Sequence, residues 1–474
     1  MKYRILLFLV MSGFSMESFS EPVSTPQNRK NISVTVYNQG FGLVRETRDI
    51  NVPKGNSSLR FEGVASLILP ETVRVKYLGR EEDFSVYEQN YEYDLISSQK
   101  LLKKYVGKDV TIYKTIEKNG STVEEPVKAN IISFNDDLIL KIGNEISLGY
   151  PGRVTVPTLP ENLFSSPTLV WKILNNSNEK NPVEVSYQTN GMNWTSDYIL
   201  VLSNDEKTTD ITSWISLTNE SGLRLEKATL QLVAGKVQRA TPQYQNYNRY
   251  DLAGSSMRKN AAAEAAPAFN EEKLSEYYLY TLDQPTDIGE NQKKQVKLFS
   301  ADNVTVSKRL YFENLPMYSG DEKYFNNAAI RYEIKNSKDS GLGKALPAGT
   351  VRVFKADSKG RQQLLGEDTI DHTPNDELLK IKVGEAFDVV ANGKQLKYEN
   401  FTIGSGYVAS YEVSLRNRKK EDITVRFYGN SSGEWKIPKS NFSFVKESSY
   451  KFYFDIPIKA GKEEKLTYTY EQKY

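Results

Sequence analysis

Strand follows strand between Val183 and Val237, and this alternation constrains the fold more than any other feature of the chain. Apolar side chains recur at every second position, beginning with Val183 and Val185. The turn pairs Asn190-Gly191 and Ser221-Gly222 interrupt the alternation. A period of two that is broken by turn residues is typical of antiparallel strands with one face in the core. The pattern predicts an all-β, mainly antiparallel fold.

Residues 161–474 are expected to form a large β-sandwich region. From Pro167 on, the expected strands are longer, carry all four tryptophans and are separated by regularly spaced turns. Residues 241–276 lack a sustained apolar period, which predicts a mobile insertion. The last strands predict an immunoglobulin-like module formed by Ser410 to Asn417, Ile423 to Tyr428, Ser449 to Ile456 and Lys465 to Tyr470.

Residues 31–160 are expected to form a smaller N-terminal β-region that follows a polar linker at 21–30. Between residues 94 and 106, apolar residues recur at helical spacing, and Gly107 follows as a helix stop. Short strands are expected on both sides of this helix. One short helix with short, strongly bent strands predicts a small barrel of the SH3 or Sm type, although a fold alone assigns no function.

The first twenty residues predict an export signal that is removed. Lys2 and Arg4 precede an apolar run at 5–11, and Ser18-Phe19-Ser20 fits a cleavage site with small residues. The run is much shorter than the roughly 20 residues of a membrane-spanning helix. The chain contains no cysteine, and a chain of this length can form a core without disulfides. These features predict the periplasm or cell envelope of a bacterium.

The charge balance argues against nucleic acid as a partner. The chain has 62 basic and 60 acidic residues, a net charge of +2. The leader holds two basic residues and one acidic residue, so its removal lowers the net charge to +1. Neither sign forms a long block. With a mean hydropathy of -0.55, no integral membrane segment is expected after the leader.

Several motifs in the second part of the chain are similar to one family. Tyr187-Gln-Thr-Asn-Gly-Met-Asn-Trp194-Thr-Ser-Asp-Tyr198 is similar to its Y-x-T-x-G-x-x-W-x-A-D-Y motif. Matching segments follow in order at Trp214 to Gly222, Ala228 to Val237, Tyr278 to Pro285, Leu365 to Pro374 and Gly384 to Asp388.

From Pro167 to Tyr474 the chain thus resembles the C-terminal domain of unknown function of the mucoidy-inhibitor-A-like proteins. That family contains envelope and cytosolic proteins. The resemblance implies no catalytic residues, because none are established for the family. The long coiled coil of the mucoidy inhibitor has no counterpart, since no sustained heptads appear in the N-terminal part.

A single histidine, His372, and the lack of cysteine restrict the available chemistry. A zinc site built from histidine or cysteine is essentially excluded, and a serine triad would have to use His372. Gly429 to Gly433 matches G-x-S-x-G, but no helix is expected after it and His372 precedes it. A hairpin turn explains this segment better. We therefore predict no catalytic residues and no cofactor.

Acidic residues gather around His372. Carboxylate oxygens suit calcium, and a carboxylate pair could serve glycoside hydrolysis. The spacing of a calcium loop is missing, however, and Asp371 to Pro374 has the residue types of a turn, which is the interpretation we favour. The calcium candidates are Glu367, Asp368, Asp371 and Asp376.

Trp194, Trp214 and His372 are candidates for a ligand-binding groove, because aromatic faces stack on sugar rings. Large aromatic residues at alternating strand positions more often belong to the core, and we favour that interpretation.

The sequence therefore predicts a non-enzymatic binding or scaffolding protein whose partner is an envelope protein or a glycan. Two alternatives stay open: a carbohydrate-active enzyme with paired carboxylates, and an outer-membrane β-barrel, suggested by the alternating residues Leu466, Tyr468 and Tyr470. The barrel ranks last, because it needs apolar outward faces on nearly every strand.

Overall fold

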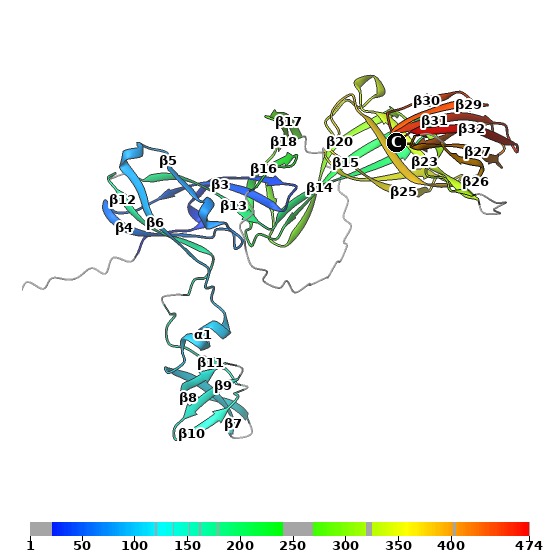
Figure 1. Ribbon diagram of the computed structural model, residues 1–474. Helices are drawn as coiled ribbons and strands as arrows, with labels where there is room; N and C mark the ends of the chain where they lie inside the picture. Colours follow the sequence, from blue (N-terminus) through cyan, green and yellow to red (C-terminus); the bar gives the residue numbers. More distant parts are fainter. Residues whose placement is uncertain are drawn as a thin grey trace, which may run out of the picture.

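The described residues form mainly β-strands, arranged in several open sheets (Figure 1). The computed structural model describes residues 21–118, 121–135, 137–150, 152–160, 163–177, 180–239, 269–318, 325–401 and 404–473. Most neighbouring strands in these ranges are antiparallel, and no sheet closes on itself. The predicted all-β, mainly antiparallel class is confirmed. The predicted leader, residues 1–20, lies outside the described residues.

The first sandwich packs two sheets around one hydrophobic core. Alternating residues such as Val34, Trp171 and Tyr187 face inward and are fully buried. One sheet contains, in order, β17 (Phe269–Leu274), β18 (Tyr277–Leu282), β16 (Leu225–Ala234), β2 (Arg29–Tyr37), β3 (Phe41–Ile50), β13 (Asn181–Asn190) and β5 (Arg74–Tyr77), and β19 (Thr286–Ile288) pairs with β16. The other contains β1 (Val23–Ser24), β4 (Gly55–Glu62), β12 (Thr168–Asn175) and β6 (Phe84–Glu92).

This sandwich corrects two of the predicted boundaries. Strands from 31–160 pair with strands from 161–474 in both sheets, for example β4 with β12 and β2 with β16. The chain therefore does not divide at residue 160. The expected linker at 21–30 is also wrong, because β1 pairs in parallel with β4 and the Arg60 amide donates to the carbonyl of Pro22 at 2.9 Å.

The predicted insertion at 241–276 lies only partly within the described residues. Residues 240–268 are outside them. Residues 269–274 form β17, which pairs along its whole length with β18. The end of the predicted insertion is therefore an edge strand of the first sandwich.

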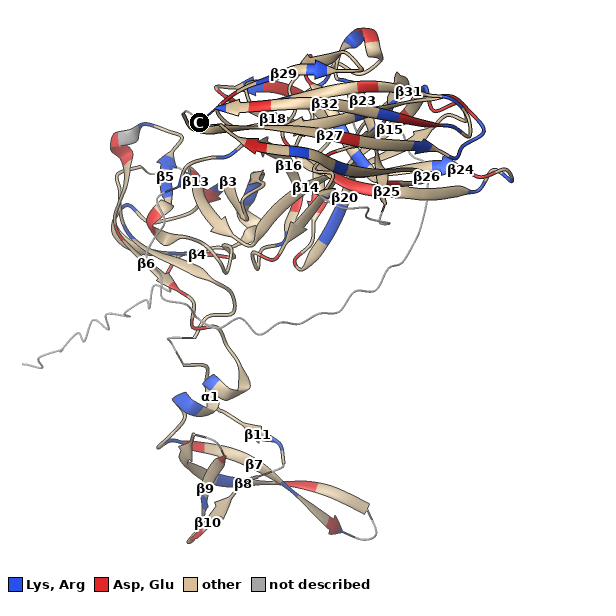
Figure 2. Ribbon diagram, turned by 45° about the vertical axis from the view of Figure 1, so that its right-hand side comes forward, with Lys and Arg blue, Asp and Glu red and all other residues tan. Residues whose placement is uncertain are grey.

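A small unit is inserted between β6 and β12 and lies apart from the sandwiches (Figures 1 and 2). The predicted helix is present as α1 (Ser98–Lys104), where the Ser97 hydroxyl accepts from the Lys100 amide at 3.2 Å. The strands form an open antiparallel sheet, so the expected barrel is not closed. In order they are β10 (Glu145–Leu148), β9 (Leu138–Ile142), β8 (Ser121–Phe134), β7 (Asp109–Lys118) and β11 (Val154–Thr155).

Long strands carry the chain from the first core into a second one. The first half of β14 packs into the first core with Trp194, and its second half packs into the second core with Tyr198 and Leu200. The sheet contains β20 (Gln292–Thr305), β15 (Thr208–Asn219), β14 (Met192–Leu202), β24 (Gly349–Ala356) and β25 (Gln362–Ile370).

The C-terminal part is one sheet that folds over so that β27 and β32 pack against β31 around a third core. Phe427, Phe454 and Leu466 are buried between its two halves. The order is β29 (Glu434–Ser440), β32 (Glu463–Lys473), β27 (Gly406–Asn417), β26 (Leu378–Asn400), β23 (Asn326–Lys335), β21 (Ser307–Phe312), β28 (Ile423–Asn430), β31 (Lys451–Ile458) and β30 (Phe444–Lys446), and β22 (Met317–Tyr318) pairs with β26.

Helical structure is confined to short pieces. Besides α1, single 3-10 turns are found at Pro26–Asn28, Pro70–Thr72, Glu81–Asp83 and Lys338–Ser340. No helix within the described ranges has the length and apolar character needed to span a bilayer.

Glu206 joins the turn after β14 to the C-terminal sheet. Its carboxylate lies 2.8 Å from Lys308 Nζ and 2.5 Å from Lys355 Nζ, and it accepts from the Tyr332 hydroxyl at 2.9 Å. Burial opposes ionisation of Glu206, but these hydrogen bonds prevail and lower its pKa to about 2. The charged form of Glu206 therefore stabilises the fold.

Lowering the pH should remove this stabilisation. A carboxyl group whose pKa is lower in the folded chain contributes stability above its unfolded pKa of about 4.5, and the contribution is lost as the pH falls toward 2. In urea denaturation between pH 6 and pH 3, we expect the wild type to lose more stability than Glu206→Gln. The control Glu226→Gln alters an exposed ion pair with Arg224 and should follow the wild type. If Glu206→Gln lost as much stability as the wild type between pH 6 and pH 3, the stabilising role of the Glu206 carboxylate would be contradicted.

Candidate functional site

The two predicted tryptophans do not form a groove. Trp194 is opposite Leu217 on β15, and Trp214 is opposite Asp197 on β14. Trp194 is buried in the first core, whereas Trp214 is partly exposed. Since directly opposite residues of paired strands share a face and alternate residues change face, the two rings lie on opposite faces of the sheet. Trp194 is a core residue, as the favoured interpretation held.

His372 forms a structural link. Its Nδ1 accepts from the Ala348 amide at 3.1 Å, and its Nε2 lies 3.1 Å from the side-chain nitrogen of Asn38 in the turn between β2 and β3. With Nδ1 as acceptor, the neutral ring carries its proton on Nε2, and the Asn38 amide oxygen is the matching acceptor once the amide is rotated. Desolvation lowers the pKa of His372, and the charge of Asp371 opposes the shift. The neutral ring thus holds the first sandwich against the second.

The four calcium candidates do not converge. The Glu367 carboxylate pairs with Arg352 at 3.0 Å, and Asp368 accepts from the Lys382 amide at 2.7 Å. Asp371 and Asp376 are exposed. Within the described residues, no group of three or more acidic or histidine side chains is placed to hold a metal ion. The structure therefore gives no support to a calcium site here.

The G-x-S-x-G segment is the turn between β28 and β29. The Ser431 hydroxyl is 2.6 Å from the Tyr470 hydroxyl, and Ser432 accepts from Gln472 at 2.7 Å. A strand follows the segment where a nucleophile elbow requires a helix. The segment is not the predicted hairpin turn, however, because β28 pairs with β21 and β31 whereas β29 pairs with β32, so it connects two strands that are not neighbours.

A pocket of about 530 Å³ lies where β21, β23 and β26 meet. Its size is in the usual range for small-ligand sites, about 300 to 1,000 Å³. Four kinds of side chain line it: the aromatic residues Tyr311, Phe312 and Phe325, the aliphatic residues Leu315, Pro316 and Ala329, the carboxamides Asn314, Asn326 and Asn327, and the charged residues Glu313, Lys382 and Glu385.

Two irregularities in the pairing of β26 with β23 shape this pocket. Asn327 pairs with Val390 but Ala328 with Ala386, and the register shifts again between Ile330 and Arg331. Such bulges redirect side chains and often lie beside functional sites. The first part of β26, before the bulges, packs into the second core, and the part after them packs into the third core. Glu385 lies between the two register shifts. Phe387, in the first bulge, is 87% exposed.

Strand β25 supports the bend of β26. A Cβ atom at Gly366 would collide with the backbone carbonyl of Val383, so the two strands approach as closely as only glycine allows. The backbone amide of Lys382, one residue before Val383 in β26, donates to the carboxylate of Asp368. Asp368 therefore satisfies a backbone donor at the bulge, which explains a carboxylate that the sequence offered as a metal ligand.

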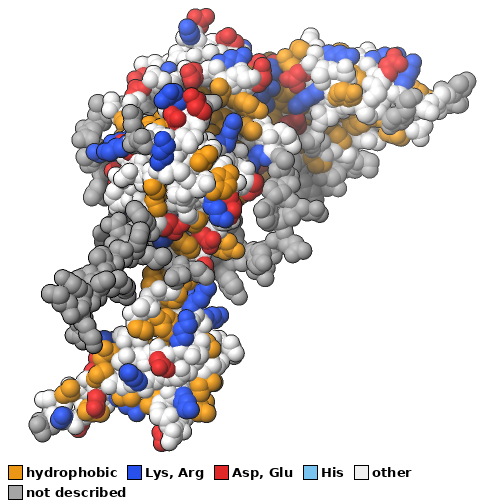
Figure 3. All heavy atoms as spheres, turned by 90° about the vertical axis from the view of Figure 1, so that its left-hand side faces the viewer, with side chains coloured by type: hydrophobic (Ala, Val, Ile, Leu, Met, Phe, Trp, Pro, Cys, Tyr) orange, Lys and Arg blue, Asp and Glu red, His pale blue; other side chains and the backbone are white. Residues whose placement is uncertain are grey.

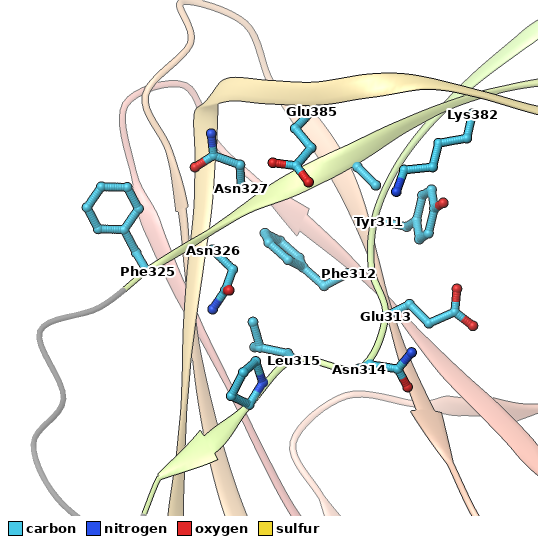
Figure 4. A pocket seen from close by; sticks show the side chains of 12 residues that line it. Tyr311, Phe312, Glu313, Asn314, Leu315, Phe325, Asn326, Asn327, Lys382 and Glu385 are labelled. Carbon is cyan, nitrogen blue, oxygen red and sulfur yellow. The ribbon is translucent and has the colours of Figure 1, made fainter. Parts of the chain in front are cut away.

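Figure 4 shows how the polar side chains lie around the pocket. Glu385 and Asn327 lie near the ring of Phe312, Asn326 lies below them, and Phe325 stands at the rim. Phe325 is 59% exposed. Within the described part of the chain, the side chains of Asn326, Asn327, Lys382 and Glu385 make no hydrogen bond or ion pair. The pocket thus combines aromatic surface with two amides, an ammonium and a carboxylate that are available to a ligand.

The other polar residues of the pocket are engaged. Glu313 pairs with Lys451 at 2.6 Å, and Asn314 accepts from the side chain of Asn430 at 2.6 Å. In Figure 4 the carboxylate of Glu313 points away from Glu385. The two glutamates therefore do not face each other across the pocket.

The sequence analysis missed this pocket. Its residues come from three separate segments, and no local motif marks Asn326 or Asn327. The one signal was indirect: Gly384 to Asp388, a segment that carries the family resemblance, covers the first bulge of β26 and includes Glu385.

Comparisons with known proteins add no assignment. Neither models of protein families nor curated proteins gave a match to this chain.

Proposed function

We propose that this chain is a non-enzymatic binding protein of the bacterial cell envelope that holds a glycan in the pocket between β21, β23 and β26. The observation that carries the proposal is the set of unengaged polar side chains beside the exposed ring of Phe325. Sugar hydroxyl groups both donate and accept hydrogen bonds. The carboxamides of Asn326 and Asn327 can do the same, whereas the carboxylate of Glu385 accepts and the ammonium group of Lys382 donates. The exposed ring of Phe325 offers an apolar face to the C–H groups of a sugar ring.

The envelope location rests on sequence features. The basic start, apolar run and small-residue cleavage site of residues 1–20 support export. The family that residues 167–474 resemble, the mucoidy-inhibitor-A-like proteins, includes envelope proteins as well as cytosolic ones, and the resemblance rests on the quoted motifs alone. In a bacterial envelope, polysaccharides are abundant ligands for an exported β-sandwich protein.

A glycan array followed by calorimetry tests the proposal. The wild type should bind a defined glycan, and Asn326→Ala/Asn327→Ala should weaken binding by about tenfold or more, since each lost hydrogen bond is worth about 0.5 to 1.5 kcal/mol. Phe325→Ala should weaken it several-fold through lost apolar contact. The control Tyr450→Ala removes an aromatic ring that is 67% exposed and lies outside the pocket, and it should bind as the wild type does.

Two results would redirect the proposal. Binding of a specific envelope protein without any glycan would favour a scaffold. Turnover of the glycan, lost in Glu385→Gln, would favour the carbohydrate-active enzyme. An affinity that survives both pocket variants unchanged would show that the ligand lies elsewhere.

A further inference from the structure

A second pocket lies in the first sandwich, far along the chain from the proposed glycan site. It has a volume of about 250 Å³ and lies beside the starts of β2 and β13 and the end of β3. Its polar lining contains more positive than negative charge: the basic residues Arg29, Lys30 and Lys180, the amides Gln27, Asn28 and Asn51, and the single carboxylate of Asp49.

Arg29 brings uncompensated charge to this pocket. Its Nε lies 2.5 Å from the Glu46 carboxylate, which also binds Arg48 at 2.9 Å. The side chains of Glu46 and Arg48 are fully buried, and that of Arg29 is 12% exposed. Two guanidinium groups thus share one carboxylate. In addition, Nη2 of Arg29 is buried without a hydrogen-bond partner in the described residues, a state that normally costs stability.

The rim of the pocket adds to this excess. Lys30 lies 3.1 Å from Asp49, so the carboxylate of Asp49 is already engaged. Lys180 is exposed and has no ion-pair partner in the described residues. The Asn28 side-chain oxygen accepts from the Thr25 amide at 2.9 Å, which leaves the Asn28 side-chain nitrogen as a donor for the pocket.

We propose that this pocket binds a phosphate group. A phosphate monoester carries a charge of about −1.5 to −2 at neutral pH and offers several strong acceptors, which fits an excess of two positive charges and several free donors. Guanidinium groups suit phosphate because their donors form a rigid fork. The phosphate belongs either to a small phosphorylated molecule or to an anionic lipid headgroup. The site is independent of the glycan pocket.

Calorimetric titration of the full chain with inorganic phosphate at low ionic strength tests the site. Arg29 is unsuitable for substitution, because it is part of the buried ion cluster. Lys30→Gln/Lys180→Gln changes two exposed side chains and should weaken binding about tenfold. The control Lys76→Gln/Lys380→Gln lowers the net charge equally at exposed positions outside the pocket and should bind as the wild type does.

Co-sedimentation with vesicles separates the two sources of phosphate. Binding to vesicles that contain phosphatidic acid, whose headgroup is a phosphate monoester, but not to phosphatidylcholine vesicles, lost in Lys30→Gln/Lys180→Gln, supports the site with a lipid headgroup as ligand. Phosphate binding without vesicle binding supports it with a small phosphorylated molecule. Failure of both probes, or equal binding by the pocket and control variants, overturns the proposal.

Discussion

Replacing Glu46 with glutamine should destabilise the protein by about 3 to 5 kcal/mol, the usual effect of removing one partner from a buried ion pair. The glutamine keeps the shape of the side chain but leaves the guanidinium groups of Arg29 and Arg48 without their carboxylate. Arg48 cannot turn to water, since it is fully buried and also donates to the backbone carbonyls of Ser24 at 3.1 Å and Glu62 at 2.8 Å.

Urea denaturation of Glu46→Gln measures this effect. Glu88→Gln is the matched control, because Glu88 pairs with Lys172 across strands at 2.7 Å in an exposed position. Exposed pairs contribute about 0 to 1 kcal/mol. If both variants unfolded at the same urea concentration, the claim that the Glu46 carboxylate stabilises the fold by pairing with Arg29 and Arg48 would be contradicted.

Gly366→Ala should also have a large effect. The added methyl group meets the backbone carbonyl of Val383, which cannot rotate away as a side chain could. Overpacking of this kind typically costs about 1 to 3 kcal/mol. Because β25 supports the bend of β26, the variant should also displace Glu385 and weaken binding in the proposed glycan pocket.

Thermal unfolding and calorimetry test the two effects of Gly366→Ala together. Leu364→Ala is the control, since Leu364 lies on the same strand and is exposed, and its loss should change stability by less than about 0.5 kcal/mol. A Gly366→Ala protein with normal stability and normal binding would show that the approach of β25 to β26 is not tight.

The sequence was sufficient to predict the strands, because their alternation is local. Val183 and Val185 point inward in β13 as their spacing required, and the one helix forms at residues 98–104, inside the expected segment 94–106 and before Gly107. The pairing of strands was not predictable in the same way. The pairing of β2 with β16, or of β4 with β12, joins residues far apart in the chain, and neither segment contains a signal for its partner.

The candidate site was harder to predict than the fold. Carboxylates near His372 suggested a ligand site, but Asp368 accepts from the backbone amide of Lys382 beside a register shift between β23 and β26. Likewise, the lone histidine suggested chemistry, whereas its two ring nitrogens link two sandwiches. Such roles depend on tertiary contacts that residue type and spacing do not encode.

A crystal structure with a glycan selected from the array would test the central claim most directly. The account predicts density for a sugar ring beside Phe325, with its hydroxyl groups within hydrogen-bonding distance of Asn326, Asn327 and Glu385. Density for the sugar at another surface, with this pocket filled only by solvent, would contradict it.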